Sequence, residues 1–226
     1  MALHESLEEG KRFFKIKRWE RALEEFLKID AGALGAEDGA ELAYYLGLSY
    51  TKLERYDDAL LYLEQVVTAA DPLRVYQCRL ALAYIYVITG RSKLAEFELG
   101  RLVKGGYESI QIYTTLAYAA WAQRQFQKAV DFYEKALTMD GNSPTALNGL
   151  GYILADSDID VKRGVSLCRR AVDKKPQSAA YLDSLGWAHF KNGDLSEARL
   201  WLRRAFELSP HQREIKKHMK IVVGEG

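Results

Sequence analysis

A small residue that recurs about every 35 positions constrains this chain more than any other feature. One series has steps of 37, 36, 34, 35 and 34 residues and consists of Ala22, Ala59, Ala95, Ala129, Gly164 and Ala198. A second series lies about twelve positions upstream and consists of Gly10, Gly47, Ala83, Ala117, Gly151 and Gly186. Internal repetition with a period of 20–50 residues is the sequence signature of a solenoid or a repeat array.

The residues between these positions indicate that each repeat contains two helices. Apolar residues recur at spacings of three and four, which is the period of an α-helix. Gly90 and Gly193 lie in the middle of a repeat, where a tight turn between helices favours a positive φ. The four prolines all fall at repeat boundaries, where no amide donor is needed: Pro72, Pro144, Pro176 and Pro210. We therefore expect antiparallel helix pairs, with the small residues where two helices cross at about 8–10 Å.

From Leu3 to His211 this pattern resembles the tetratricopeptide repeat (TPR) family, whose motif runs W-x2-L-G-x2-Y…A-x3-F. The closest match to the motif is formed by Leu185, Gly186, Ala198, Leu202, Ala205 and Pro210. The resemblance implies an all-α fold, a right-handed superhelical solenoid of about six TPR helix pairs that forms a single domain over residues 1–226. The repeats are assigned to residues 3–36, 40–73, 76–109, 110–143, 144–178 and 179–212, with a C-terminal capping helix at 211–222.

Several details refine this expectation. The capping helix offers Ile215 and Met219 to the core. Residues 30–39 read as a glycine-rich loop that lengthens the first junction. The stretch 146–205 looks like the paired repeats of bacterial TPR proteins, which implies a multi-repeat adaptor of the bacterial type.

In the TPR family the first helix of each pair lines a concave groove, and the repeat register then names the lining. Aromatic side chains follow the small residue in four successive repeats, and rigid aromatics dominate binding hot spots. The predicted groove residues are Tyr84, Tyr118, Trp121, Asn148, Tyr152, Asp183, Trp187 and Phe190. We expect a non-enzymatic scaffold that binds an extended segment or a helix of a protein partner there. The alternative is that these aromatics pack on neighbouring repeats and leave no open groove.

TPR proteins that grip the C-terminal carboxylate of heat-shock chaperones use Lys, Asn and Arg at defined groove positions. The corresponding positions of this chain do not carry that set: Leu7, Lys11, Tyr45, Gln77 and Ala81, or Thr114, Tyr118, Gly149, Ala180 and Ser184. We therefore expect no chaperone carboxylate clamp.

Charge is distributed unevenly, although the net charge is only +1 and gives no general reason to expect nucleic acid. Residues 161–226 carry 14 basic and 7 acidic side chains, whereas residues 1–160 carry 18 and 24. Opposite charges at the two ends favour an alternative in which the protein self-assembles head to tail. A second alternative is an acidic or phosphate-bearing partner bound by a basic patch on the convex face, formed by Arg169, Arg170, Arg203 and Arg204.

The sequence shows no set of side chains typical of an enzyme active site. The four histidines do not converge, so neither a zinc site nor a His-based triad is expected. Asp156, Asp158 and Asp160 resemble the start of a calcium loop but lack its glycine and final acid, and Asp156 and Asp158 are expected to cap the next helix. We expect no cofactor and no metal, and read Cys168 as a packing residue. Free thiols, no apolar run long enough for a membrane span and no visible signal favour the cytoplasm. The periplasm is the alternative if the natural chain has a signal upstream.

Overall fold

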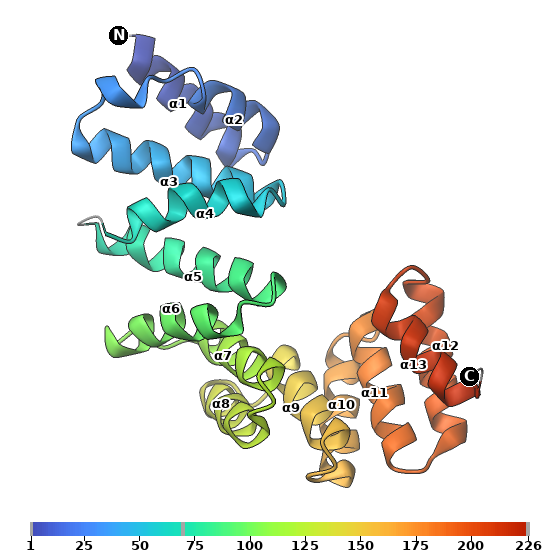
Figure 1. The fold of residues 1–226 in the computed structure, drawn as a ribbon. Helices are drawn as coiled ribbons and strands as arrows, with labels where there is room; N and C mark the ends of the chain where they lie inside the picture. The colour runs from blue at the N-terminus through green and yellow to red at the C-terminus, as the bar shows by residue number, and fades with distance from the viewer. Residues whose placement is uncertain (1, 69–70, 225–226) are drawn as a thin grey trace. The chain divides into compact units, whose positions relative to one another are not determined.

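The computed structural model describes residues 2–68 and 71–224, and all the regular structure in them is helical. Six helices lie in the first half of the chain: α1 Ala2–Lys15, α2 Trp19–Phe26, α3 Ala36–Lys52, α4 Tyr56–Val66, α5 Pro72–Ile88 and α6 Ser92–Lys104. Seven follow: α7 Ile110–Ala122, α8 Phe126–Met139, α9 Pro144–Asp156, α10 Val161–Lys174, α11 Ala179–Lys191, α12 Leu195–Leu208 and α13 Arg213–Val223. Consecutive helices pack as six pairs followed by α13, so the all-α expectation is confirmed (Figure 1).

The chain forms two compact units, which are described separately. The N-terminal unit is Met1–Tyr107 with helices α1–α6, and the C-terminal unit is Glu108–Gly226 with helices α7–α13. Each unit contains three helix pairs of the predicted repeat, and the C-terminal unit also contains α13. That the repeats form one continuous solenoid stays a prediction.

The small residues lie where the two helices of a pair cross, as the spacing predicts. All twelve residues of the two series are buried. A Cβ added to Gly47 would lie 2.7 Å from Leu63 Cγ. Likewise, a Cβ added to Gly186 would lie 2.7 Å from Leu202 Cγ. Leu63 and Leu202 each stand four residues after an alanine of the first series, so the two series mark the two sides of the same helix crossing.

One turn conformation joins the helices of all six pairs. Gly90 and Gly193 have positive φ values of 76° and 87°, as expected for a tight turn. The equivalent turns also contain a residue with positive φ, although it is not glycine: Lys17, Glu54, Arg124 and Asp158. The neighbouring packing therefore holds the left-handed conformation even where the side chain disfavours it.

Two local expectations are wrong. Residues 36–39 form the first turn of α3 and not the end of a long loop, and a short 3-10 helix occupies Ala31–Ala33. Asp160 caps α10, because its carboxylate accepts a hydrogen bond from the Arg163 amide at 3.0 Å. Asp156 instead accepts from the Trp187 indole, and Asp158 pairs with Lys191.

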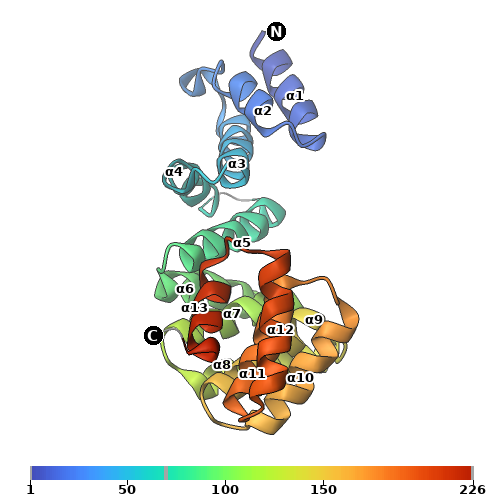
Figure 2. The ribbon, with the colours of Figure 1, turned by 90° about the vertical axis from the view of Figure 1, so that its right-hand side faces the viewer.

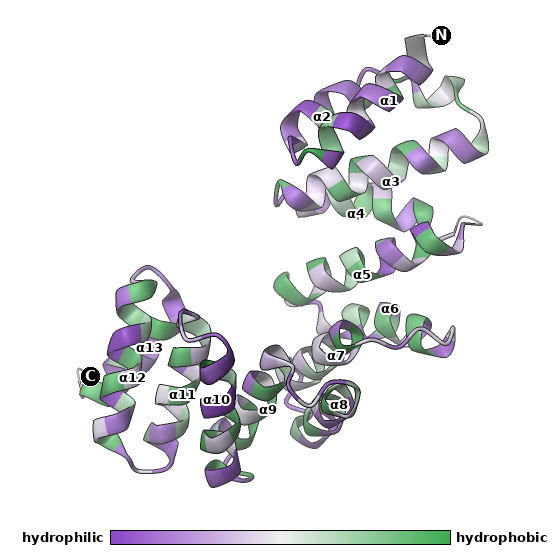
Figure 3. Ribbon diagram, turned by 180° about the vertical axis from the view of Figure 1, so that it is seen from behind, coloured by the Kyte–Doolittle hydropathy of each residue, from purple (hydrophilic) through white to green (hydrophobic). Residues whose placement is uncertain are grey.

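The helix α13 packs against α12 and α11 at the end of the C-terminal unit (Figure 2). Ile215 and Val222 are buried on its inner side, and the partly buried Met219 packs on Ala198 and Leu202. In Figure 3 both hydrophilic and hydrophobic segments appear along α13, as expected of a helix with one buried face. The predicted capping helix is therefore present, shifted by one or two residues from 211–222.

The reactivity of the two cysteines measures how tightly the helix pairs pack. Cys78 and Cys168 are both fully buried, and burial raises the pKa of each thiol to about 12. The thiolate is the reactive form, so we expect no labelling of the native protein by iodoacetamide at pH 8. Mass spectrometry should show two labels after denaturation, and rapid labelling of the native protein would contradict the packing.

Candidate functional site

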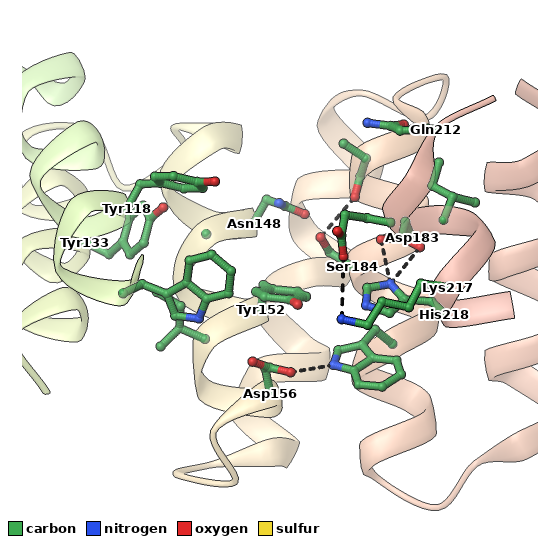
Figure 4. A pocket seen from close by; sticks show the side chains of 17 residues that line it. Tyr118, Tyr133, Asn148, Tyr152, Asp156, Asp183, Ser184, Gln212, Lys217 and His218 are labelled. Atoms are coloured by element: carbon green, nitrogen blue, oxygen red, sulfur yellow. Dashed lines mark hydrogen bonds and ion pairs between the residues drawn. The ribbon is translucent and has the colours of Figure 1, made fainter. Parts of the chain in front are cut away.

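A cavity of about 570 Å³ opens within the C-terminal unit, between the first helices of its three pairs and α13 (Figure 4). We call it the aromatic pocket, and the helices α7, α9 and α11 supply most of its lining, as expected for a concave TPR face. The complete lining is Tyr118, Trp121, Tyr133, Asn148, Gly149, Tyr152, Ile153, Asp156, Ala180, Asp183, Ser184, Trp187, Gln212, Glu214, Ile215, Lys217 and His218.

Helical periodicity explains why these side chains share one cavity. Asn148, Tyr152 and Asp156 stand four residues apart on α9, so they form one stripe along that helix. Tyr118 and Trp121 stand three apart on α7, which places them on the same face of that helix as well. The central stripe on α9 therefore presents an amide, an aromatic ring and a carboxylate in sequence.

Aromatic rings form a connected series across the pocket. The ring of Trp121 lies 5.5 Å from that of Tyr118 and 5.9 Å from that of Tyr152, measured between centroids. The series continues to the His218 imidazole, 6.3 Å from Tyr152, and His218 stacks on Trp187 at 4.2 Å. Rigid rings arranged in this way supply contact area at a low cost in conformational entropy.

The helix α13 closes one side of the pocket through a buried pair. His218 Nδ1 donates to Asp183 Oδ2 at 2.9 Å and lies 3.0 Å from Oδ1. Both side chains are almost fully buried. Trp187, on which His218 stacks, donates its indole N–H to Asp156 Oδ1 at 2.9 Å (Figure 4). A chain of contacts therefore joins α13, α11 and α9.

Two tyrosines shape the floor of the pocket. Tyr133 comes from α8, and its ring lies against Gly149 of α9. A Cβ added to Gly149 would lie 2.2 Å from Tyr133 Cζ, so a larger residue at this position would collide with the ring. Burial raises the pKa of Tyr152, and the negative charges of Asp156 and Asp183 raise it further. The Tyr152 phenol therefore stays protonated at neutral pH and keeps its hydrogen-bond donor.

The structure brings together six of the eight predicted groove residues in this pocket: Tyr118, Trp121, Asn148, Tyr152, Asp183 and Trp187. Phe190 is not in the lining, since it packs on the core cluster of Ala198, Leu202 and Val222. Tyr84 belongs to the N-terminal unit, where its side chain is half exposed. Tyr118 remains 45% exposed, whereas the Trp187 ring stacks on the His218 imidazole of α13.

Sequence reasoning missed Tyr133, Asp156 and His218 as pocket residues. The spacing of four from Tyr152 could have placed Asp156 on the same stripe. No sequence signal places His218 beside Asp183, because the two are joined only by the way α13 folds back.

The basic patch is partly occupied by contacts within the fold. The guanidinium groups of Arg169 and Arg204 lie 4.6 and 4.7 Å from the centroid of the Trp201 ring. Arg170 Nη2 donates to the Gly141 carbonyl at 2.9 Å, and Arg203 is exposed. Three of the four arginines therefore have partners within the chain.

Among residues 2–68 and 71–224, no group of three or more His, Cys, Asp or Glu side chains is arranged to hold a metal ion. No helix in the described part of the chain has the length and apolar character needed to cross a membrane.

Comparison with known families identifies the repeats. A family described as tetratricopeptide repeat matches residues 7–75, 46–108 and 114–179, and a second family of the same description matches residues 179–212. These ranges cover most of the chain.

Two curated proteins show the range of relatives. The chain is 27% identical to human protein O-mannosyl-transferase TMTC1 over 192 residues, which are 83% of this chain and 21% of that protein. It is 32% identical to the TPR repeat-containing protein PA4667 of Pseudomonas aeruginosa over 95 residues, which are 42% of this chain and 15% of that protein. The matches therefore span about a fifth of these relatives or less, and in TMTC1 only the TPR region is matched.

Solved structures agree on the fold. The Cut9–Hcn1 assembly of the APC/C matches 96% of this chain and 42% of its own with a TM-score of 0.76 and 12% identity. YrrB, described as a TPR protein with an unusual peptide-binding site, matches 89% of this chain and 97% of its own with a TM-score of 0.58 and 15% identity.

Proposed function

The chain belongs to the tetratricopeptide repeat family, and we propose that it binds a segment of a partner protein in the aromatic pocket. The TPR repeats imply a protein–protein interaction scaffold. The aromatic pocket as the binding site, and an extended or helical form of the bound segment, belong to the proposal. We propose no catalytic role, since TPR domains are typically non-catalytic.

One observation carries the proposal: a connected series of aromatic rings lines a cavity and has one end open to solvent. Tyr118 is 45% exposed, and the centroid of its ring lies 5.5 Å from that of Trp121. Aromatic side chains that are partly exposed and held by neighbouring rings are typical interface anchors. They lose little conformational entropy when a partner binds.

The dimensions favour an extended segment or a single helix with apolar anchors as the occupant. The cavity reaches from α7 to α13 and therefore contacts all three pairs of the C-terminal unit. YrrB, which shares the fold, is described as having a peptide-binding site, and this likeness is consistent with a peptide ligand.

The two alternative modes of action predict different behaviour. Self-assembly through oppositely charged ends would make the size in solution depend on protein and salt concentration. Binding of an acidic partner by the basic patch would require Arg169 and Arg204, which instead pack on Trp201. The pocket is therefore the better-supported site.

The double variant Tyr118→Ala with Tyr152→Ala tests the proposal. We expect partner capture from a lysate of the source organism to fall at least about tenfold, because each aromatic anchor typically contributes more than about 1 kcal/mol. The variant should stay folded with a moderately lower melting temperature, since neither side chain is fully buried but the Tyr152 ring packs on Trp121 and His218.

Phe206→Ala is the matched control, because Phe206 is an exposed aromatic on α12 outside the pocket. Capture by this variant should equal that of the wild type. Equal capture by the double variant would contradict the proposal and move the site elsewhere on the protein.

A further inference from the structure

We propose that the aromatic pocket receives an arginine side chain of the partner segment, an inference that rests on the proposed function. Two acceptors in the pocket have no cationic partner among the residues that the structure describes: Asn148 Oδ1 has no hydrogen-bond donor, and the Asp156 carboxylate is bonded only to the neutral Trp187 indole. Flat aromatic faces lie beside the Asp156 carboxylate in the same pocket.

Asn148 carries an acceptor that the fold leaves unsatisfied. Its Oδ1 atom is buried and has no hydrogen-bond partner, although it lines the cavity. Leaving a buried acceptor unsatisfied costs free energy, so a rotation of the Asn148 amide that brings Oδ1 to the cavity and to a donor of the partner would be favourable. Asn148 stands two helical turns from Asp156 on α9, about 12 Å along the axis, so the donor for Asn148 is an N–H group of the partner segment other than the guanidinium.

Asp156 provides the charge. Asp183 is bonded to His218 and Glu214 lies 3.9 Å from Lys217, so these two carboxylates have basic partners in the pocket. Asp156 is bonded to a neutral donor, the Trp187 indole, which leaves its negative charge without compensation from that contact.

This carboxylate does not belong to a generally acidic surface. Residues 108–226 contain 17 Lys and Arg against 14 Asp and Glu. Asp156 therefore places a negative charge on the face of α9 that lines the pocket, in a unit whose net charge is positive.

Tyr118, Trp121 and Tyr152 select arginine among the cationic side chains. A guanidinium group is flat, stacks on aromatic faces and still directs N–H groups sideways to a carboxylate or an amide oxygen. A lysine ammonium is more strongly hydrated and gains less from such stacking. The same chain already shows the arrangement elsewhere, because Arg169 and Arg204 lie over the Trp201 ring.

The four tryptophans supply a direct readout. In a proton–nitrogen NMR spectrum of the full chain, the indole signals of Trp121 and Trp187 report on the pocket, and those of Trp19 and Trp201 lie outside it. We expect N-acetyl-arginine amide to shift the Trp121 and Trp187 signals saturably and to leave the other two in place. The lysine amide should bind several-fold more weakly, and the norleucine and glutamate amides should cause no saturable shift.

The variant Asp156→Asn separates charge from shape, since the amide oxygen can still accept from the Trp187 indole. We expect it to weaken binding of the arginine amide about tenfold, the loss of one charge-assisted hydrogen bond. Asp173→Asn removes the same charge from an exposed position on α10 and should leave binding unchanged.

Three results would overturn the arginine inference: no saturable shift with the arginine amide, equal binding of the norleucine or lysine amide, or equal losses in Asp156→Asn and Asp173→Asn. Partner capture distinguishes this failure from that of the proposed function. If capture depends on Tyr118 and Tyr152 while the arginine amide does not bind, only the arginine inference fails. If capture is independent of both tyrosines, the proposed function fails first.

Discussion

Replacing Gly151 with leucine is expected to destabilise the C-terminal unit strongly. A Cβ at this position would lie 2.9 Å from two backbone atoms of α10, the Cys168 nitrogen and the Gly164 oxygen. Backbone atoms cannot turn aside as a side chain can, so α9 and α10 would have to separate. Overpacking of this kind should lower the free energy of unfolding by about 3 kcal/mol.

Urea denaturation followed by tryptophan fluorescence measures this loss. Gly100→Leu is the control, because Gly100 lies in α6 and nothing stands within 4 Å of its added Cβ. That substitution should stabilise the helix by about 0.5–1 kcal/mol, since glycine is a poor helix former. A wild-type unfolding curve for Gly151→Leu would contradict the close approach of α9 to the α10 backbone at this position.

The second large effect is expected from His218→Ala. The substitution leaves the Asp183 carboxylate buried without its hydrogen-bonded partner and removes the ring stacked on Trp187. Breaking a buried pair from one side typically costs about 3–5 kcal/mol, and here the loss should fall first on the docking of α13. Amide hydrogen exchange in residues 213–223 should therefore accelerate strongly.

Lys217→Ala provides the comparison on the same helix. The Lys217 side chain is 65% exposed and its pair with Glu214 spans 3.9 Å, a surface contact of little energetic value. Hydrogen exchange in this variant should resemble that of the wild type. If both variants exchanged at the same rate, His218 would not be the residue that holds α13 in place.

The parts of the fold that depend on close helix contact could be predicted from the sequence. Where two helices touch, only Gly or Ala fits on one side, so the positions of Gly47 and Gly186 already mark the crossings. The groove-facing register of Tyr118, Tyr152 and Trp187 follows from the same spacing, because each stands one residue after a small residue.

Other features depend on tertiary contacts that leave no trace in the repeat pattern. Arg124 adopts a positive φ because the packed helices on either side impose the turn, and an arginine gives no hint of this. The pairing of His218 with Asp183 arises only after α13 folds back on α11. Tyr133 enters the pocket because Gly149 makes room for it, a relation between two different helices.

Site-specific photocrosslinking tests the central claim, that the partner segment lies in the aromatic pocket. Benzoylphenylalanine would replace Tyr118 in one variant and Phe206, which lies on α12 outside the pocket, in another. After irradiation in a lysate of the source organism, we predict a crosslinked partner with the probe at position 118 and none with the probe at position 206. The same partner crosslinked at position 206 and absent at position 118 would contradict the claim.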